Sequence, residues 1–177
     1  MKRVIFLAAA IILFSSNCKK NKHPIPPDNP YGLPNATQTG ANIFACRVNG
    51  QNWISETGIY EMGGGYSGDT IWASGKTSTQ LHYERITVRV DGNSIVGNTD
   101  MIASNSSAKI FFQGNRNCLC PDGGCSVFTI YATSGQIIVT NIDTQRKIIS
   151  GKFECKIPMP QCDTLVITDG RFDIRYH

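Results

Sequence analysis

The chain has 177 residues, of which 41% are hydrophobic and 17% charged, and its 17 basic and 13 acidic residues give a net charge of +4. Five basic residues and one acidic residue precede Tyr31, so from Tyr31 onward the balance is 17 − 5 = 12 against 13 − 1 = 12. The positive charge therefore belongs to the N-terminal segment, and no basic domain surface predicts binding to nucleic acid.

The first 17 residues have the pattern of an export signal. Lys2 and Arg3 precede an uncharged apolar run over residues 4–14, which the small polar residues 15–17 follow. The run is too short for a permanent membrane span, which needs roughly 20 apolar residues. A positive start, a short apolar middle and a small-residue exit predict a cleaved signal peptide over residues 1–17.

Cys18 ends the sequence FSSNC, which resembles the lipobox of bacterial lipoproteins, where the cysteine becomes the lipidated first residue. The usual motif has Gly or Ala directly before the cysteine and Leu three positions before it, whereas this chain has Asn17 and Ser15. The alternative is an ordinary secretory signal that leaves Cys18 as a free thiol. The odd number of cysteines in the chain favours lipidation of Cys18 over a free thiol.

The chain has seven cysteines, an odd number for an exported protein. If Cys18 carries a lipid, six remain, which is enough for three disulfides in an oxidising compartment. Several pairings are open among them. The favoured one joins Cys118 or Cys120 to Cys125 across a Pro-Asp-Gly-Gly turn, Cys155 to Cys162 around KIPMPQ, and Cys46 to the remaining member of the first cluster.

The cluster NCLCPDGGCS also has three thiols that are potential metal ligands. Structural zinc sites combine a C-x(2–4)-C pair with a second such pair or with histidines. The three histidines of the chain (His23, His82 and His177) are scattered. Disulfides are therefore favoured over zinc, and neither a metal site nor a cofactor is predicted.

Residues 18–40 are predicted to be the lipidated cysteine and a flexible tether. Residues 19–40 contain five prolines and almost no apolar pattern. This composition favours polyproline II and does not pack a core.

Residues 41–177 are predicted to form one β-domain, because apolar residues alternate with polar ones along several segments. Inward positions are expected at Phe44, Cys46 and Val48, at Ile86, Val88 and Val90, at every second residue from Ile149 to Ile157, and at Phe172, Ile174 and Tyr176. Further strands are expected near 69–74, 108–113, 126–132 and 135–142. Asn49–Gly50 predicts a hairpin turn, and GGGYSG and TDG are interpreted as turns.

No segment has a helical period, so the fold class is all-β. About eight or more short antiparallel strands predict a β-sandwich or a barrel-like roll, and both arrangements fit the pattern.

Three aromatic residues, Trp53, Tyr66 and Trp72, are the candidate ligand-binding residues. Exposed aromatic rings on a β-sandwich stack on sugars, which would make this chain a carbohydrate-binding module. The favoured alternative places the two tryptophans in the core, because large aromatic side chains dominate small β cores.

No catalytic residues are predicted. A glycosidase needs two facing carboxylates, but the acidic residues here occur mostly singly, at turns or at outward strand positions. The histidines stand apart from any G-x-S-x-G motif. The chain is expected not to be an enzyme, and an envelope hydrolase is the remote alternative.

The segments FACRVNGQNW, GQIIVTNIDTQRKIISGKFECKI and DTLVITDGRFDIRY resemble a family of Bacteroidota lipoproteins. These proteins have an N-terminal lipidated cysteine, one β-rich domain of unknown function and a closing ITDGxFDxxY strand. The resemblance spans most of residues 42–176. It implies an acylated (palmitate-bearing) Cys18 and an outer-membrane anchor, but no enzymatic activity.

The side of the membrane is predicted from the residues after Cys18. Surface-exposed lipoproteins of Bacteroidota usually have acidic residues there, whereas this chain has Lys19, Lys20 and Lys22, which favours the periplasmic side. We therefore expect a non-enzymatic binding or structural module, with the membrane and another envelope component, protein or glycan, as its partners.

Overall fold

A computed structural model of the chain describes residues 29–58, 61–78, 83–92, 99–101, 107–115, 127–160 and 162–177. The chain divides into two compact units, Met1–Pro30 and Tyr31–His177. The strands belong to the second unit. This unit begins at Tyr31, ten residues before the predicted domain boundary at residue 41.

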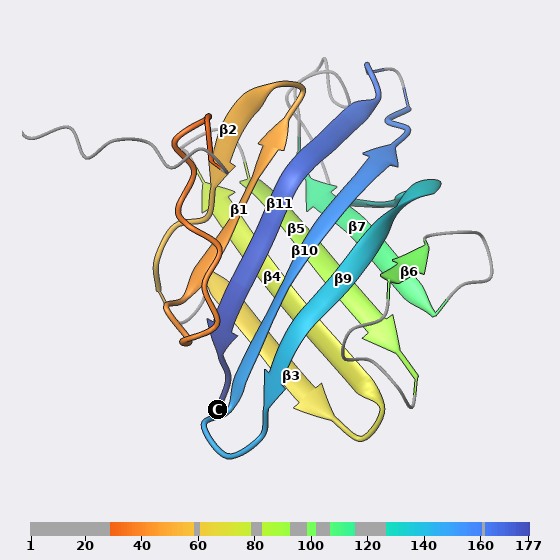
Figure 1. Ribbon diagram of the computed structural model, residues 1–177. Coiled ribbons are helices and arrows are strands. Elements are labelled where there is room, and N and C mark those ends of the chain that lie inside the picture. The colour runs from red at the N-terminus through yellow and green to blue at the C-terminus, as the bar shows by residue number, and fades with distance from the viewer. Residues whose placement is uncertain are drawn as a thin grey trace, which may run out of the picture. The chain divides into compact units, whose positions relative to one another are not determined.

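Within the described residues, eleven strands form two antiparallel sheets (Figure 1). Sheet A has the order β2-β1-β11-β10-β9-β6, and sheet B has the order β3-β4-β5-β7-β8. The strands are β1 Ile43–Val48, β2 Gln51–Ile54, β3 Met62–Ser67, β4 Thr70–Ser78, β5 Tyr83–Asp91, β6 Thr99–Met101, β7 Ala108–Gly114, β8 Phe128–Tyr131, β9 Ser134–Asp143, β10 Ile148–Ile157 and β11 Leu165–Arg175.

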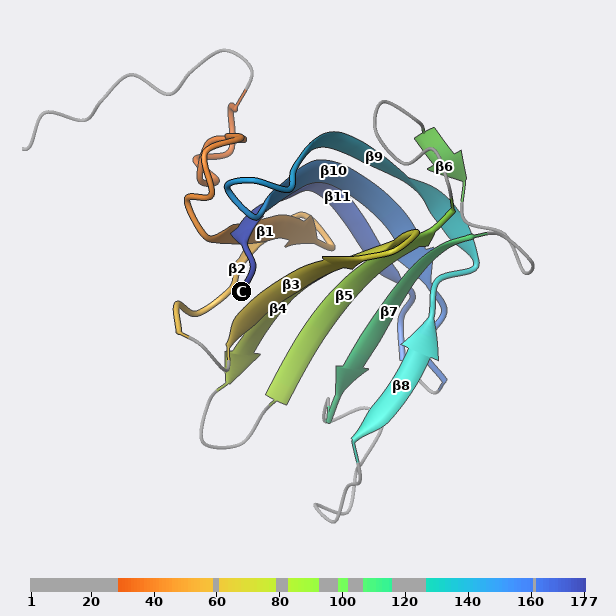
Figure 2. The ribbon, with the colours of Figure 1, turned by 90° about the horizontal axis from the view of Figure 1, so that it is seen from below.

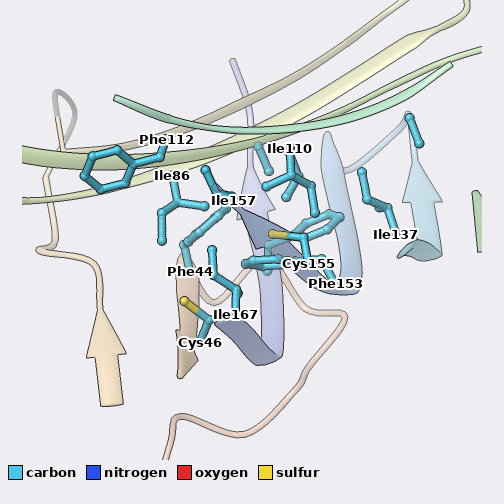
Figure 3. Close-up of a cluster of buried hydrophobic side chains, with 14 of the residues drawn as sticks. Phe44, Cys46, Ile86, Ile110, Phe112, Ile137, Phe153, Cys155, Ile157 and Ile167 are labelled. Atoms are coloured by element: carbon cyan, nitrogen blue, oxygen red, sulfur yellow. The ribbon is translucent and has the colours of Figure 1, made fainter. Parts of the chain in front are cut away.

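The two sheets pack face to face, and their strands cross one another in Figure 1, while Figure 2 shows the two layers edge on. The predicted all-β class is confirmed, and of the two predicted arrangements the structure has the sandwich. Side chains from both sheets meet between the layers (Figure 3). Phe44, Phe153 and Phe172 form a chain of ring contacts at 5.2 and 6.5 Å between centroids.

The alternation of apolar residues explains which face each strand buries. Phe44, Cys46 and Val48 on β1 are buried, as are the predicted inward residues of β5 and β10. The Asn49–Gly50 turn between β1 and β2 has φ values of 49° and 80°. Two positive φ values define the type I′ turn that such a pair predicts, and this hairpin is confirmed.

Two predicted turns are wrong. GGGYS belongs to strand β3, and the turn follows it at Gly68 and Asp69. The TDG sequence lies inside β11, where the register shifts and Asp169 has a φ of 54°. It is a β-bulge rather than a connection, and a short polar residue tolerates the positive φ that a bulge requires.

Residues 31–41, here called the strap, lie on the outer face of sheet A and correct the prediction of a flexible tether through residue 40. Leu33 is buried, and Arg171 donates from Nη1 to the Pro34 carbonyl at 3.2 Å. The Tyr31 ring stacks under the Arg47 guanidinium at 3.7 Å from its centroid. The prolines misled the prediction because the attachment depends on backbone amides and isolated side chains, which leave no apolar period.

Asp173 on β11 is the main attachment point of the strap. The alternation correctly places it on the outer face, yet it is only 1% exposed because the strap covers it. Gly40, with a φ of 73°, lets consecutive amides turn toward the carboxylate, a concave arrangement that binds anions. The carboxylate accepts hydrogen bonds from the Thr37 hydroxyl (2.5 Å), the amides of Thr39 (3.0 Å), Gly40 (2.9 Å) and Ala41 (3.0 Å), and the Ser150 hydroxyl (2.8 Å).

The hydrogen bonds keep Asp173 ionised. Burial by itself raises the pKa of a carboxyl group, but the bonds from the Ala41 amide, the two hydroxyls and the Gly40 amide outweigh it. The pKa of Asp173 therefore lies below its ordinary value.

We expect Asp173→Asn to lower the free energy of unfolding by about 1–3 kcal/mol at pH 7, because the amide leaves buried donors without an ionised acceptor. The folded-state pKa is below the unfolded value near 4, so this contribution is complete above about pH 4 and disappears as the pH falls through the folded-state pKa. Urea denaturation of both proteins at pH 7 and pH 3 measures it.

The matched control is Glu154→Gln on the exposed face of β10, which should change stability by less than about 0.5 kcal/mol. An equal difference between wild type and Asp173→Asn at both pH values would contradict the role of the ionised carboxylate.

Candidate ligand-binding cavity beside strand β3

The three predicted aromatic residues do not share a surface. Trp53 on β2 is 8% exposed, packs edge-on against Phe44 and donates its indole N–H to Glu84 at 3.0 Å. It is a core residue, as the favoured alternative predicted. Tyr66 is partly buried against the core. Trp72 is 41% exposed and lies on the outer face of sheet B, so of the three only Trp72 presents a ring to solvent.

The Trp72 indole lies over the glycines of β3. A Cβ atom on Gly65, its cross-strand partner, would lie 2.5 Å from the indole nitrogen, and one on Gly63 would lie 3.4 Å from the ring. Cross-strand neighbours on one face of a sheet contact each other directly, and a glycine leaves room for a large aromatic ring. The glycines of GGGYS therefore provide the floor on which the ring rests.

Beside this ring and β3 is a cavity of about 460 Å³, within the range of small-ligand sites. Its lining comes from β3 and β4, from the segment between β2 and β3, from the residue before β1, and from the C-terminal end of β11 and the residues after it. The lining residues are Asn42, Thr57, Gly58, Met62, Gly63, Gly64, Trp72, Ile174, Arg175, Tyr176 and His177.

Local contacts hold the walls of the cavity in place. The Arg175 amide donates to the Asn42 side-chain oxygen at 3.0 Å, which ties the start of β1 to the end of β11. The segment between β2 and β3 is held near its start, because the Glu56 amide donates to the Lys76 carbonyl at 2.9 Å. The cavity is thus built by rigid strands and by short segments bonded to them.

The lining combines apolar surface, aromatic rings and hydrogen-bonding groups. Met62 and Ile174 are apolar, Trp72 and Tyr176 are aromatic, and Arg175 contributes a positive charge. Among the described lining residues there is no Asp or Glu. Burial raises the pKa of the Tyr176 phenol, with further contributions from Tyr66 and Asp143, so this hydroxyl stays protonated and able to donate at neutral pH. Such a lining suits recognition of a ligand that combines apolar and hydrogen-bonding groups.

Sequence reasoning named Trp72 but missed the rest of the cavity. Asn42 and Thr57 lie more than a hundred residues before Arg175 and His177 in the chain. The antiparallel pairing of β1 with β11 brings these two ends together. The sequence did contain one signal, the run of three glycines at 63–65. Glycines inside a strand indicate that a side chain, a ligand or another backbone approaches the strand closely.

The predicted pairings of Cys155 with Cys162 and of Cys46 with a member of the Cys118–Cys125 cluster are wrong, because Cys46 and Cys155 are buried free thiols. Burial raises the pKa of both thiols, that of Cys155 to about 12.

Cys162 is partly buried against the core and is disulfide-bonded. Cys18, Cys118, Cys120 and Cys125 lie outside the described residues. In the part of the chain that the structure describes, no group of three or more His, Cys, Asp or Glu side chains is arranged to hold a metal ion.

Comparison of the chain with protein-family models, with curated proteins and with solved structures finds no match. Among the described residues, no helix is long and apolar enough to cross a membrane.

We expect Cys46 and Cys155 to be inert to a thiol reagent such as Ellman's reagent in the native protein at pH 8, because burial suppresses the thiolate that reacts. In urea without reductant, both should react. Cys46→Val should remove one of these two reactive thiols. Reaction of the native protein at the rate of the unfolded chain would contradict the buried state of the two cysteines.

Proposed function

We propose that this protein is a lipid-anchored, non-enzymatic module of the bacterial cell envelope that binds another envelope component in the cavity beside β3. The export pattern of residues 1–17 and the position of Cys18 support the anchor. The resemblance to Bacteroidota lipoproteins supports an outer-membrane location, facing the periplasm.

The observation that carries the binding role is the composition of the cavity. Its volume of about 460 Å³, its aromatic wall and its hydrogen-bonding groups match sites that hold a ligand by a few oriented polar groups. The same lining supports a non-enzymatic module, because its described residues offer one guanidinium and one imidazole and no pair of facing carboxylates.

A second candidate function is carbohydrate binding, and the exposure of Trp72 favours it. Its indole lies against the β3 glycines with 41% of its surface accessible, a geometry that suits stacking on a sugar ring. Trp53 contributes nothing to such a surface because it is in the core, so the site would depend on a single aromatic platform.

The anchor is tested by the intact mass of the membrane-extracted protein before and after reduction. We expect the mass of residues 18–177 plus acyl chains. With Cys18 acylated and Cys46 and Cys155 free, four of the seven cysteines remain to form disulfides. Reduction should therefore add at most four hydrogens rather than six. An unlipidated mass would contradict the anchor.

The binding role is tested by site-specific photo-cross-linking in living cells. A photo-reactive residue at Thr57, which is exposed and lines the cavity, should give an adduct of higher mass. The same residue at Lys152, exposed on the outer face of sheet A, is the matched control and should give none. An adduct that protease shortens indicates a polypeptide, and one that polysaccharide hydrolases shorten indicates a glycan.

No adduct at Thr57, or equal adducts at both positions, would contradict binding in the cavity.

A further inference from the structure

We propose that β3 binds an extended polypeptide segment of a partner with apolar residues at alternate positions, which adds to sheet B as an extra strand and places its side chains in the cavity. This inference rests on the proposed function, because it names the ligand class of the same cavity. It follows from the direction of the β3 backbone groups, from the lack of edge protection, and from the apolar and aromatic lining of the cavity.

The direction of the backbone groups follows from one hydrogen bond. The Gly92 amide donates to the Asp69 carbonyl at 2.7 Å. Asp69 precedes Thr70 on β4, and Gly92 follows its partner Asp91 on β5. A bond between these two neighbours means that Thr70 and Asp91 do not hydrogen-bond to each other. Thr70 consequently directs its own N–H and C=O toward Ser67 on β3, across the two-residue turn.

Hydrogen-bonded pairs alternate along an antiparallel ladder. Since Ser67–Thr70 is hydrogen-bonded, Gly65–Trp72 and Gly63–Ser74 are also hydrogen-bonded pairs. Met62, Gly64 and Tyr66 then direct their amides and carbonyls away from β4. The Met62 amide donates to the Gly58 carbonyl at 3.2 Å. Gly64 lines the cavity, so its amide and carbonyl lie where a ligand strand would pair.

The β3 edge lacks the features that usually prevent strand addition. Of the sheet-edge strands that the structure describes, β2 and β8 have four residues and β6 has three, whereas β3 has six. Edge strands are commonly protected by shortness, by lysine, by proline or by a bulge. Met62–Ser67 has no charged residue and no proline, and its three glycines leave the backbone accessible.

The walls of the cavity favour a single extended chain over a second copy of the sandwich. Thr57 and Gly58 and the residues from Ile174 to His177 line the same cavity as the β3 glycines. An added strand alternates its side chains between two faces, one beside Trp72 and the other beside Met62 and Ile174. Apolar residues at alternate positions of the partner segment would suit this arrangement.

The lining selects the apolar character of the segment. Arg175 donates from Nη2 to the Thr39 carbonyl at 3.5 Å, so the strap on the outer face of sheet A engages its guanidinium. Met62, Ile174 and Trp72 supply the side-chain surface that a bound strand would contact. Charged residues at the contacting positions of the segment would lose their hydration there, which disfavours them.

The test uses the full lipid-bearing chain in detergent micelles and a phage-displayed library of random linear nine-residue peptides. We expect enrichment of peptides with apolar residues at alternate positions. A synthetic enriched peptide should slow hydrogen exchange at the Gly64 and Tyr66 amides by at least about tenfold, since pairing protects edge amides. The amides of Gly63, Gly65 and Ser67 already pair with β4 and should change less. The same peptide with every backbone amide N-methylated should bind at least about tenfold more weakly, because neither of its edges can donate a hydrogen bond to β3.

Gly63→Glu is the blocking variant. Its side chain extends over the outer face at the edge, where a Cβ makes only ordinary contact with Trp72 at 3.4 Å, and its charge would lose water against the apolar side chains of a bound strand. We expect at least about tenfold weaker binding with an unchanged urea midpoint. Thr129→Glu on β8, at the other edge of sheet B, is the matched control and should leave the Kd unchanged.

Absence of enriched peptides, protection outside residues 62–67, or equal binding of the N-methylated peptide would each overturn strand addition. The cross-linking result separates this failure from that of the proposed function. A glycan adduct at Thr57 without peptide binding would retain the cavity as a binding site and reject the polypeptide ligand. Absence of both would reject the two together.

Discussion

The buried carboxylate of Asp173 is the interaction on which the position of the strap depends. An ionised group that is 1% exposed is costly unless hydrogen bonds replace its water, and here the strap supplies four of the five donor groups. The strap also packs close to Ile148 of β10, which is buried and would lie 3.0 Å from a Cβ atom on Gly40. One charge thus gives sheet A an outer layer as well as an inner one.

The same attachment shortens the tether. If Cys18 carries the lipid and the strap begins at Tyr31, the chain between them is residues 19–30 rather than residues 19–40. At about 3.1 Å per residue in polyproline II, this segment reaches at most roughly 40 Å, compared with roughly 70 Å for the longer one. The domain would therefore operate closer to the membrane than the proline content suggests.

The sequence pattern was sufficient where burial follows a period of two, as in β1, β5, β10 and β11, and where a dipeptide has one structural meaning, as at Asn49–Gly50. It failed where a residue type has two uses. GGGYS was interpreted as a turn because glycine is usual in turns, but here the glycines make room for the Trp72 ring. Cys155 was assigned to a disulfide with Cys162, and Cys46 to one with a member of the Cys118–Cys125 cluster, because of an odd-even count, which contains no distances. The cavity lay beyond the pattern because its walls come from opposite ends of the chain.

Strand β11 contacts both the strap and the cavity. Asp173 and Arg175 lie two residues apart on β11, so their side chains share the outer face. Asp173 holds the amides of Thr39 to Ala41, and Asn42, the next residue, accepts the Arg175 amide and lines the cavity. A ligand strand in the cavity would therefore contact a wall that the buried carboxylate already fixes. Ordering this wall before binding removes an entropic cost from association, so a short peptide segment can bind with the few backbone hydrogen bonds that β3 offers.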